Sequence, residues 1–454
     1  MLRSNMWTWA SRVLVIGLAL WSVIRIAGAI QGATETPDAP GETLNLSSVD
    51  FHSFWYYNQL LREGRDPYQG YLSSAAPQFP IEHLDGVTAS PDDLLRPMGS
   101  FDLMTAYPYT APFVLLISPL SFFTWPVARA IWLAINLGMM LVIPWLACRF
   151  VQNETQRIPF TAALLLALVF YSFLPVKVVL GYGQTTLLIL ALMLVALLLA
   201  REDRDVLAGI VLGVALSKYS LAIGVLVFFL FQMKIRLLVT AAITQIAAVV
   251  GLALLASTPP LDIVRDYLDT GSKVGQQAGI HLENYLHFLP QAAAIGIALV
   301  CTVAIVAAAF ARFRRVPGSP GEALAASTLI TWSLIPAYHN YYDAAVLIIP
   351  LAFVVLVLYH SGRWRLSGAE AAALAALGLV ALGLLVFPGT SLVERLIPSM
   401  TETWGHVQER WGVTIVVLAL TGVQLWLLAR LRYAQAAEQP AHTAEVRVRR
   451  TVPA

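Results

Sequence analysis

One acidic residue stands where a polar segment gives way to an aromatic one. Asp50 begins the stretch DFHSFWYYNQLLRE, whose large apolar side chains recur at helical spacing, so we expect an amphipathic helix over about 50–63 on the membrane surface. Asp50 could cap this helix as a favoured N-cap residue, or serve as a general base at the membrane edge. Both roles coexist only if one carboxylate oxygen stays free. The apolar face would comprise Phe51, Phe54, Trp55 and Leu61.

Two further segments place polar side chains between apolar stretches. VKVVLGYGQTTLL holds Lys177, Tyr182 and Gln184, and VALSKYSLAIG holds Lys218. Polar groups at membrane depth are costly and usually serve function. The simpler alternatives are a lysine whose ammonium extends to the interface for Lys218 and an interhelical hydrogen bond for Gln184.

The segment SLIPAYHNYYDAAVL carries Tyr338, His339 and Asp343 after a proline. If a helix starts near Asn340, the imidazole and the carboxylate lie one turn apart. Asp343 would then orient His339 and raise its basicity. The simpler alternatives are a hydrogen-bonded interfacial histidine and tyrosines that anchor the chain at the membrane surface.

The chain that must position these residues has 454 residues, 58% hydrophobic and only 12% charged, with a mean hydropathy of +0.70. Soluble domains are about a quarter charged, so the composition excludes a soluble globular enzyme and a disordered protein. A net charge of +2 gives no footprint for nucleic acid. We therefore expect an all-α polytopic membrane bundle. Because Cys148 and Cys301 lie in apolar runs, no disulfide framework or metal cluster is expected.

Roughly thirteen apolar segments alternate with polar connections, and charge sorts the connections into two sides. The loop 31–107 has 11 acidic residues and 3 arginines, a net charge of −8, and we place it outside together with the loop 257–288. The basic clusters and both termini then face the cytoplasm. The first apolar run, 9–30, is interpreted as a retained signal anchor. These features predict a multi-pass protein of the plasma (inner) membrane with its active site on the outer face.

Termini on one side require an even number of crossings, and we expect about 12. One apolar segment then does not cross by itself. We prefer 111–123, which prolines interrupt, as a segment that dips in and returns; alternatively, 206–232 is one bent helix. Residues 1–433 would form a single transmembrane domain, and 434–454 a disordered cytoplasmic tail.

Five motifs occur in order along the chain, namely DFHSFWYYNQLLREGRDPY, YPYTAPFVLLISPL, GYGQTTLL, GIVLGVALSKYS and YHNYYDAAVL. Together they resemble glycosyltransferase family 87, over about residues 49–350. This resemblance implies a membrane mannosyltransferase of the GT-C fold that takes sugar from a polyprenyl-phosphate donor to a glycolipid or glycan acceptor. No nucleic acid partner is expected.

The resemblance also assigns roles to single residues. The family's acidic residue in the first outer loop, taken as the catalytic base, falls on Asp50, and the histidine of its late motif falls on His339. The lysine of its glycine-rich helix corresponds to Lys218 and the glutamine of its GQ motif to Gln184. We expect further substrate contacts from Tyr182, Tyr338, Asp66 and Tyr107.

The chemistry then needs a base for the acceptor hydroxyl and cations for the departing lipid phosphate, which Lys218 and His339 could supply. Attack with a single base predicts inversion at the anomeric carbon. The donor is already activated, and the chain has neither a P-loop nor GxGxxG. We expect no cofactor or metal, although Asp50, His52 and Asp66 are close enough in sequence to keep a divalent metal as an alternative.

Two other classes of protein stay open at this point. A secondary transporter or lipid flippase would line its pathway with Lys218 and His339. Transporters usually hold such residues at the midplane of broken helices, whereas here they collect towards one face. A structural subunit without chemistry predicts that Asp50, Lys218 and His339 do not converge.

Overall fold

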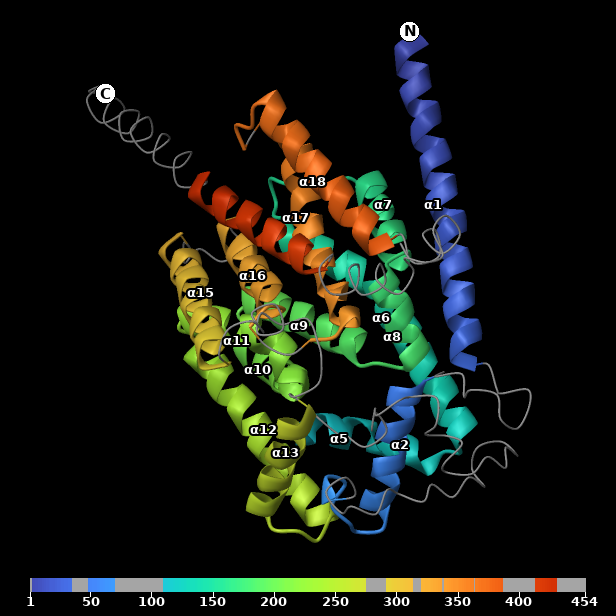
Figure 1. Ribbon diagram of the computed structural model, residues 1–454, viewed down its shortest axis with the longest axis vertical. Coiled ribbons are helices and arrows are strands. Elements are labelled where there is room, and N and C mark those ends of the chain that lie inside the picture. The colour runs from blue at the N-terminus through green and yellow to red at the C-terminus, as the bar shows by residue number, and fades with distance from the viewer. Residues whose placement is uncertain are drawn as a thin grey trace, which may run out of the picture.

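The computed structural model describes residues 2–34, 48–69, 109–274, 291–312, 320–336, 339–362, 364–386 and 413–430. Within these ranges the chain contains helices and no strand, which confirms the all-α prediction. Figure 1 shows the helices in one bundle, with α1 along one side and α2, α5 and α13 together at one end. The predicted tail and most of the first outer loop lie outside the described residues.

Within the described ranges, short connections join consecutive helices. Three segments of the described chain are 3₁₀-helices, namely η3 (Ser118–Phe122), η4 (Leu216–Lys218) and η5 (Tyr341–Leu347). The α-helices are α1 (Leu2–Thr34), α2 (Val49–Arg62), α5 (Ala111–Ile117), α6 (Trp125–Val151), α7 (Phe160–Tyr171), α8 (Leu174–Tyr182), α9 (Thr186–Arg201), α10 (Asp205–Ala215), α11 (Tyr219–Phe231), α12 (Ile235–Leu255), α13 (Pro260–Val274), α15 (Gln291–Arg312), α16 (Pro320–Ser333), α17 (Ile348–Tyr359), α18 (Gly368–Val386) and a last helix, Val413–Arg430.

Several helices suit a membrane interior. Six helical stretches of the described chain are long and apolar enough to cross a bilayer, and α7 with α8, which meet at 53°, makes a seventh if the bent pair is one span. This supports a multi-pass membrane protein. The count of about 12 crossings is not confirmed, since several apolar helices fall below the length test. These shorter helices are Val15–Gln31, Ala111–Phe122, Thr186–Arg201 and Ile295–Ala311.

The apolar stretch Asp205–Phe231 folds back on itself at η4. Lys234, just beyond its end, makes ion pairs at 3.2 Å with Asp203 and 3.0 Å with Asp205, just before and at its start. A straight helix of 27 residues would hold those ends about 40 Å apart. Helices α10 and α11 therefore form a hairpin whose tip carries Lys218.

Helix α2 confirms the predicted element but not its predicted surroundings. Its apolar residues Phe51, Phe54, Trp55 and Leu61 are buried in a cluster with side chains of α5 and α6. Phe51 stacks on Trp132 with ring centroids 5.0 Å apart. The periodicity of α2 thus records packing against protein, and the expected burial of this face in the membrane surface is wrong. The same pattern serves both environments, because each offers apolar surface.

A second helix lies in what the sequence presented as the loop 257–288. Helix α13 contacts the end of α12, and its Ile263 is buried in the cluster around α2. Leu261, Val264 and Leu268 are exposed on its other face. Such an apolar face at the edge of a membrane bundle is typical of a helix lying in the interface.

Candidate active site

Asp50 occupies the first turn of α2, and its carboxylate is bonded by an amide from another part of the chain. Gln184 donates from Nε2 to Asp50 Oδ2 at 2.5 Å. The N-cap position belongs to Ser48, which has left-handed backbone angles, so the capping role for Asp50 is wrong. The carboxylate is half-buried.

The turn between α8 and α9 brings Gln184 to α2. Gly183 has φ +67°, and a Cβ on it would lie 2.6 Å from Cβ of Phe51, so only glycine fits here. Trp132 Nε1 donates to the carbonyl of Gly183 at 2.7 Å. The backbone N–H of Ser48 donates to the carbonyl of Gly181 at 2.6 Å, which joins the start of α2 to this turn.

Tyr109 continues the network from Gln184. Its hydroxyl donates to Gln184 Oε1 at 2.9 Å and accepts from Thr185 Oγ1 at 3.0 Å. Its carbonyl accepts from the hydroxyl of Tyr68 at 2.8 Å, which ties the segment after α2 to the same site. These bonds fix the amide of Gln184 so that its NH₂ faces Asp50.

Thr186, which follows Thr185, contacts an ion pair whose carboxylate is buried. Lys218 pairs with Asp343 and donates to Thr186 Oγ1 at 3.1 Å. Thr186 in turn donates to Asp343 Oδ1 at 2.6 Å. The ammonium also lies 4.8 Å from the ring centroid of Tyr342. Lys218 is therefore held by specific partners at the hairpin tip and does not simply extend to the interface.

His339 supports this ion pair from behind. Its Nδ1 lies 3.1 Å from Asp343 Oδ2, which confirms the predicted one-turn spacing, and its Nε2 lies 3.1 Å from the carbonyl of Ser333. Asn340 caps η5 through a capping box with Asp343. Because the imidazole is fully buried and both ring nitrogens have partners, its position is that of a residue that orients Asp343.

Burial makes Asp50 a stronger base than a free carboxylate. It raises the pKa of Asp50 to about 6, even though the hydrogen bond from Gln184 and the positive charge of Lys218 act to lower it. A carboxylate with this pKa is mostly ionised at neutral pH and still accepts a proton readily.

Asp66 stands apart from this network. Its Oδ1 accepts from the backbone N–H of Tyr68 at 2.8 Å. Burial, with the nearby Asp266, raises the pKa of Asp66 to about 7. Tyr182 is exposed at the end of α8. Among the remaining predicted contacts, Tyr107 and Tyr338 lie outside the described residues.

The structure thus joins four predicted residues through others that the sequence did not single out. Asp50 and Gln184 form one end, and Lys218 and His339 the other. Tyr109, Thr185 and Thr186 link them, and Asp343 proves to be the counter-ion of Lys218. The sequence feature that could have pointed to Thr185 and Thr186 is their position directly after Gln184 in GYGQTTLL. In the part of the chain that the structure describes, no three His, Cys, Asp or Glu side chains are grouped to hold a metal ion.

Comparison with known families identifies the class of protein. The family model for "Glycosyltransferase family 87" matches residues 107–337, which is half of the chain. The protein therefore belongs to glycosyltransferase family 87, and this membership implies a glycosyltransferase that works in a membrane on a sugar donor and an acceptor. It does not favour the transporter alternative. A search of curated proteins and solved structures returned no match.

Proposed function

We propose that the protein transfers a sugar, mannose in the first instance, from a polyprenyl-phosphate donor to a glycolipid or glycan acceptor, with Asp50 as general base. The observation that carries this proposal is the polar network that connects a half-buried carboxylate to a half-buried lysine. It runs from Asp50 through Gln184 and Tyr109 to the adjacent threonines and Lys218.

The first part of the reaction takes place at Asp50. The acceptor hydroxyl gives its proton to the carboxylate while its oxygen forms a bond to the anomeric carbon. The amide of Gln184 holds one carboxylate oxygen, so the other is the proton acceptor. A pKa of about 6 suits this role at neutral pH.

The second part is departure of the lipid phosphate. The bond from the anomeric carbon to the phosphate oxygen breaks, and the electron pair leaves with the polyprenyl phosphate. Lys218 supplies the compensating positive charge, and Asp343 with His339 keeps the ammonium in place. Because Asp343 is engaged by Lys218, Thr186 and His339, it is not free to attack the sugar, which favours inversion by a single displacement.

The proposed topology has twelve crossings and places the site towards the outer face of a plasma membrane. The crossings would be α1, α6, the bent pair α7–α8, α9, α10, α11, α12, α15, α16, α17, α18 and Val413–Arg430. Ion pairs at the ends remote from Asp50 support this scheme, since Lys234 meets Asp205 and Arg201 lies 3.9 Å from Glu322. Basic residues gathered at that end favour the cytoplasmic side for it.

Transfer assays with purified protein test the proposal. Polyprenyl-phosphate mannose, polyprenyl-phosphate glucose and a nucleotide sugar would each be offered with a glycolipid acceptor, with and without a chelator. We expect transfer from the polyprenyl donors only, insensitive to chelation, with an inverted anomeric centre by NMR. Transfer from the nucleotide sugar alone would overturn the donor assignment, and retention would overturn the single displacement.

A further inference from the structure

A polar cavity lies at the other end of the helices that carry the candidate active site. It has a volume of about 750 Å³ and is lined by the ends of α6 and α9 and by the connection from α6 to α7. Helices α6 and α9 begin near Asp50 and Lys218. The 16 residues of α9 put about 24 Å between its two ends. The cavity is therefore separate from the candidate active site.

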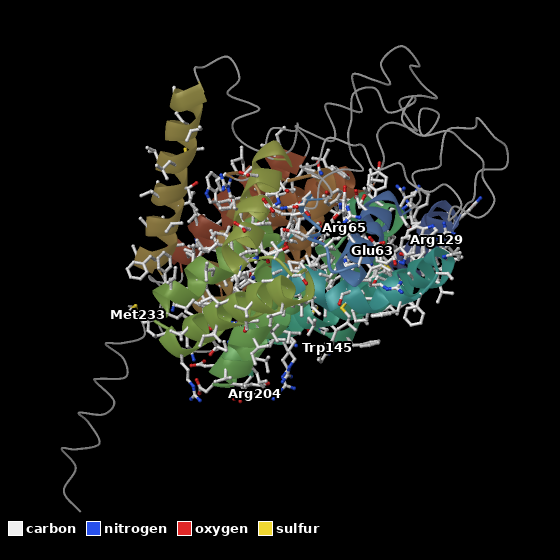
Figure 2. The ribbon with its side chains drawn as sticks, turned by 90° about the horizontal axis from the view of Figure 1, so that it is seen from below. Glu63, Arg65, Arg129, Trp145, Arg204 and Met233 are labelled. Carbon is white, nitrogen blue, oxygen red and sulfur yellow. The ribbon has the colours of Figure 1, made fainter. Side chains whose placement is uncertain are left out.

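The position of the cavity agrees with a membrane interface. Figure 2 shows Trp145 and Arg204 along one edge of the bundle, apart from Arg129 and Glu63. Trp145 lies one turn before the cavity residue Arg149, and it is exposed, as is Phe160 at the start of α7. Exposed tryptophan beside arginine is typical of the headgroup layer.

Only part of the positive charge that lines the cavity is paired with acidic groups of the protein. Arg201 is engaged, because it donates to the carbonyl of Phe150 and lies 3.9 Å from Glu322. Glu202 is also engaged, at 3.8 Å from Arg204. Arg149 and Arg157 also line the cavity.

Those two arginines carry the inference. Neither side chain has an acidic partner within 4.0 Å among the residues that the structure describes, and both are exposed at the cavity. The cavity's remaining acid, Glu154, is exposed and opposes them with one negative charge. Guanidinium groups bind phosphate through paired hydrogen bonds.

The rim between the two arginines is already ordered. Asn153 Oδ1 accepts from the backbone N–H of Thr155 at 3.0 Å and from that of Gln156 at 2.8 Å. Gln152 Oε1 accepts from the backbone N–H of Ile158 at 3.1 Å. A rim held in this way loses little conformational freedom when a ligand binds.

We propose that this cavity binds a phosphate-bearing anion at the membrane surface opposite the candidate active site, through Arg149 and Arg157. The headgroup of an anionic phospholipid and free phosphate share this chemistry. The inference does not depend on the proposed transfer reaction, because no residue of the cavity belongs to the network around Asp50.

The test measures binding to purified protein in a neutral detergent, by thermal shift and by native mass spectrometry. The probes are short-chain phosphatidylglycerol, short-chain phosphatidylcholine and inorganic phosphate. We expect phosphatidylglycerol to bind and to raise the unfolding temperature. Equal binding of inorganic phosphate would identify free phosphate as sufficient, whereas a response to phosphatidylglycerol alone would identify the lipid.

Variants decide whether the two arginines are responsible. Arg149→Gln with Arg157→Gln should weaken binding about 100-fold, since each charge-assisted contact accounts for roughly tenfold or more. Glu154→Gln should strengthen binding, and Arg236→Gln, an exposed arginine of α12 outside the cavity, should leave it unchanged. The single Arg→Lys variants keep the charge and serve if the double variant fails to fold. Wild-type affinity in the double variant, or equal losses in Arg236→Gln, would overturn the proposal.

Discussion

At the scale of single residues, the main feature is a carboxylate whose surroundings make it a base. Asp50 is half-buried, and its carboxylate accepts a hydrogen bond from Gln184. It is not the N-cap residue of α2. Its sequence context predicted a helix start but could not separate capping from catalysis. Only the backbone at Ser48, which takes the N-cap position, decides against the cap.

Asp50→Asn tests the base directly. Asparagine has nearly the same size and can still accept from Gln184, but it cannot take the acceptor proton. We expect transfer to fall by about 10²–10⁴-fold with an unchanged unfolding temperature, measured by a donor-to-acceptor assay and a thermal melt. Asp262→Asn in α13 is the matched control and should retain activity. Wild-type transfer in Asp50→Asn would leave Asp50 without a catalytic role.

Gln184→Leu tests the hydrogen bond to that base. Since the bond acts to lower the pKa of Asp50 from within a site where burial raises it to about 6, its loss should raise the pKa further. The base is active when ionised, so kcat/KM of the wild type should rise as pH increases through about 6, and the acidic limb should move to higher pH in the variant.

The control is Gln245→Leu, which removes an amide bonded to the carbonyl of Gly213. It should leave the pH profile unchanged. An acidic limb at the same pH in Gln184→Leu and the wild type would show that another group controls the rate.

Lys218 needs two variants, because its ion pair has a structural role as well. Lys218→Met leaves the buried Asp343 carboxylate without its cation, which should lower the free energy of unfolding by about 3–5 kcal/mol. Adding Asp343→Asn removes that charge and should restore most of the stability. Transfer should stay low in the double variant, because the cation for the departing phosphate is still missing. A stable double variant with normal transfer would reduce Lys218 to a structural residue.

At the scale of elements, the site depends on how closely α2 approaches the turn after α8. The sequence predicted the helix that became α2 within a residue of its bounds, and it predicted the spacing of His339 and Asp343. Both follow from local periodicity. The contacts of Tyr109 and the pairing of Lys218 with Asp343 join segments far apart in the chain, and one sequence does not show which helices are neighbours.

Gly183→Ala tests the close approach of α2. An alanine there would be strained at φ +67°, and its Cβ would lie 2.6 Å from that of Phe51. We expect a loss of about 1–2 kcal/mol in stability and a larger loss of transfer, since α2 must shift and carry Asp50 away from Gln184. Gly181→Ala is the control, because nothing lies within 4 Å of a Cβ there. Equal stability and equal transfer in the two variants would show that the site does not depend on the close approach of α2 to Gly183.

At the scale of the whole molecule, the polar groups divide between two ends of the bundle. The network around Asp50 lies at one end, and the arginine cavity with the ion pairs of Lys234 lies at the other. The sign of charge in the loops predicts that the two ends lie on opposite sides of the membrane, and this stays a prediction. The number of crossings also stays a prediction, because α10 and α11 are each too short to pass as a span alone and are joined directly through η4.

This division predicts which residues are reachable from each side of the membrane. In a background with Cys148→Ala and Cys301→Ala, single cysteines would replace Glu63, beside α2, and Met233, beyond α11. Figure 2 shows the two positions well separated, and both residues are exposed. A membrane-impermeant maleimide should label Glu63→Cys in intact cells and Met233→Cys only after permeabilisation, because the basic residues near Met233 favour the cytoplasmic side. Labelling of both from one side would overturn the two-ended topology. The reverse pattern would place Asp50 at the cytoplasmic face, where a donor exposed on the outer leaflet could not reach it.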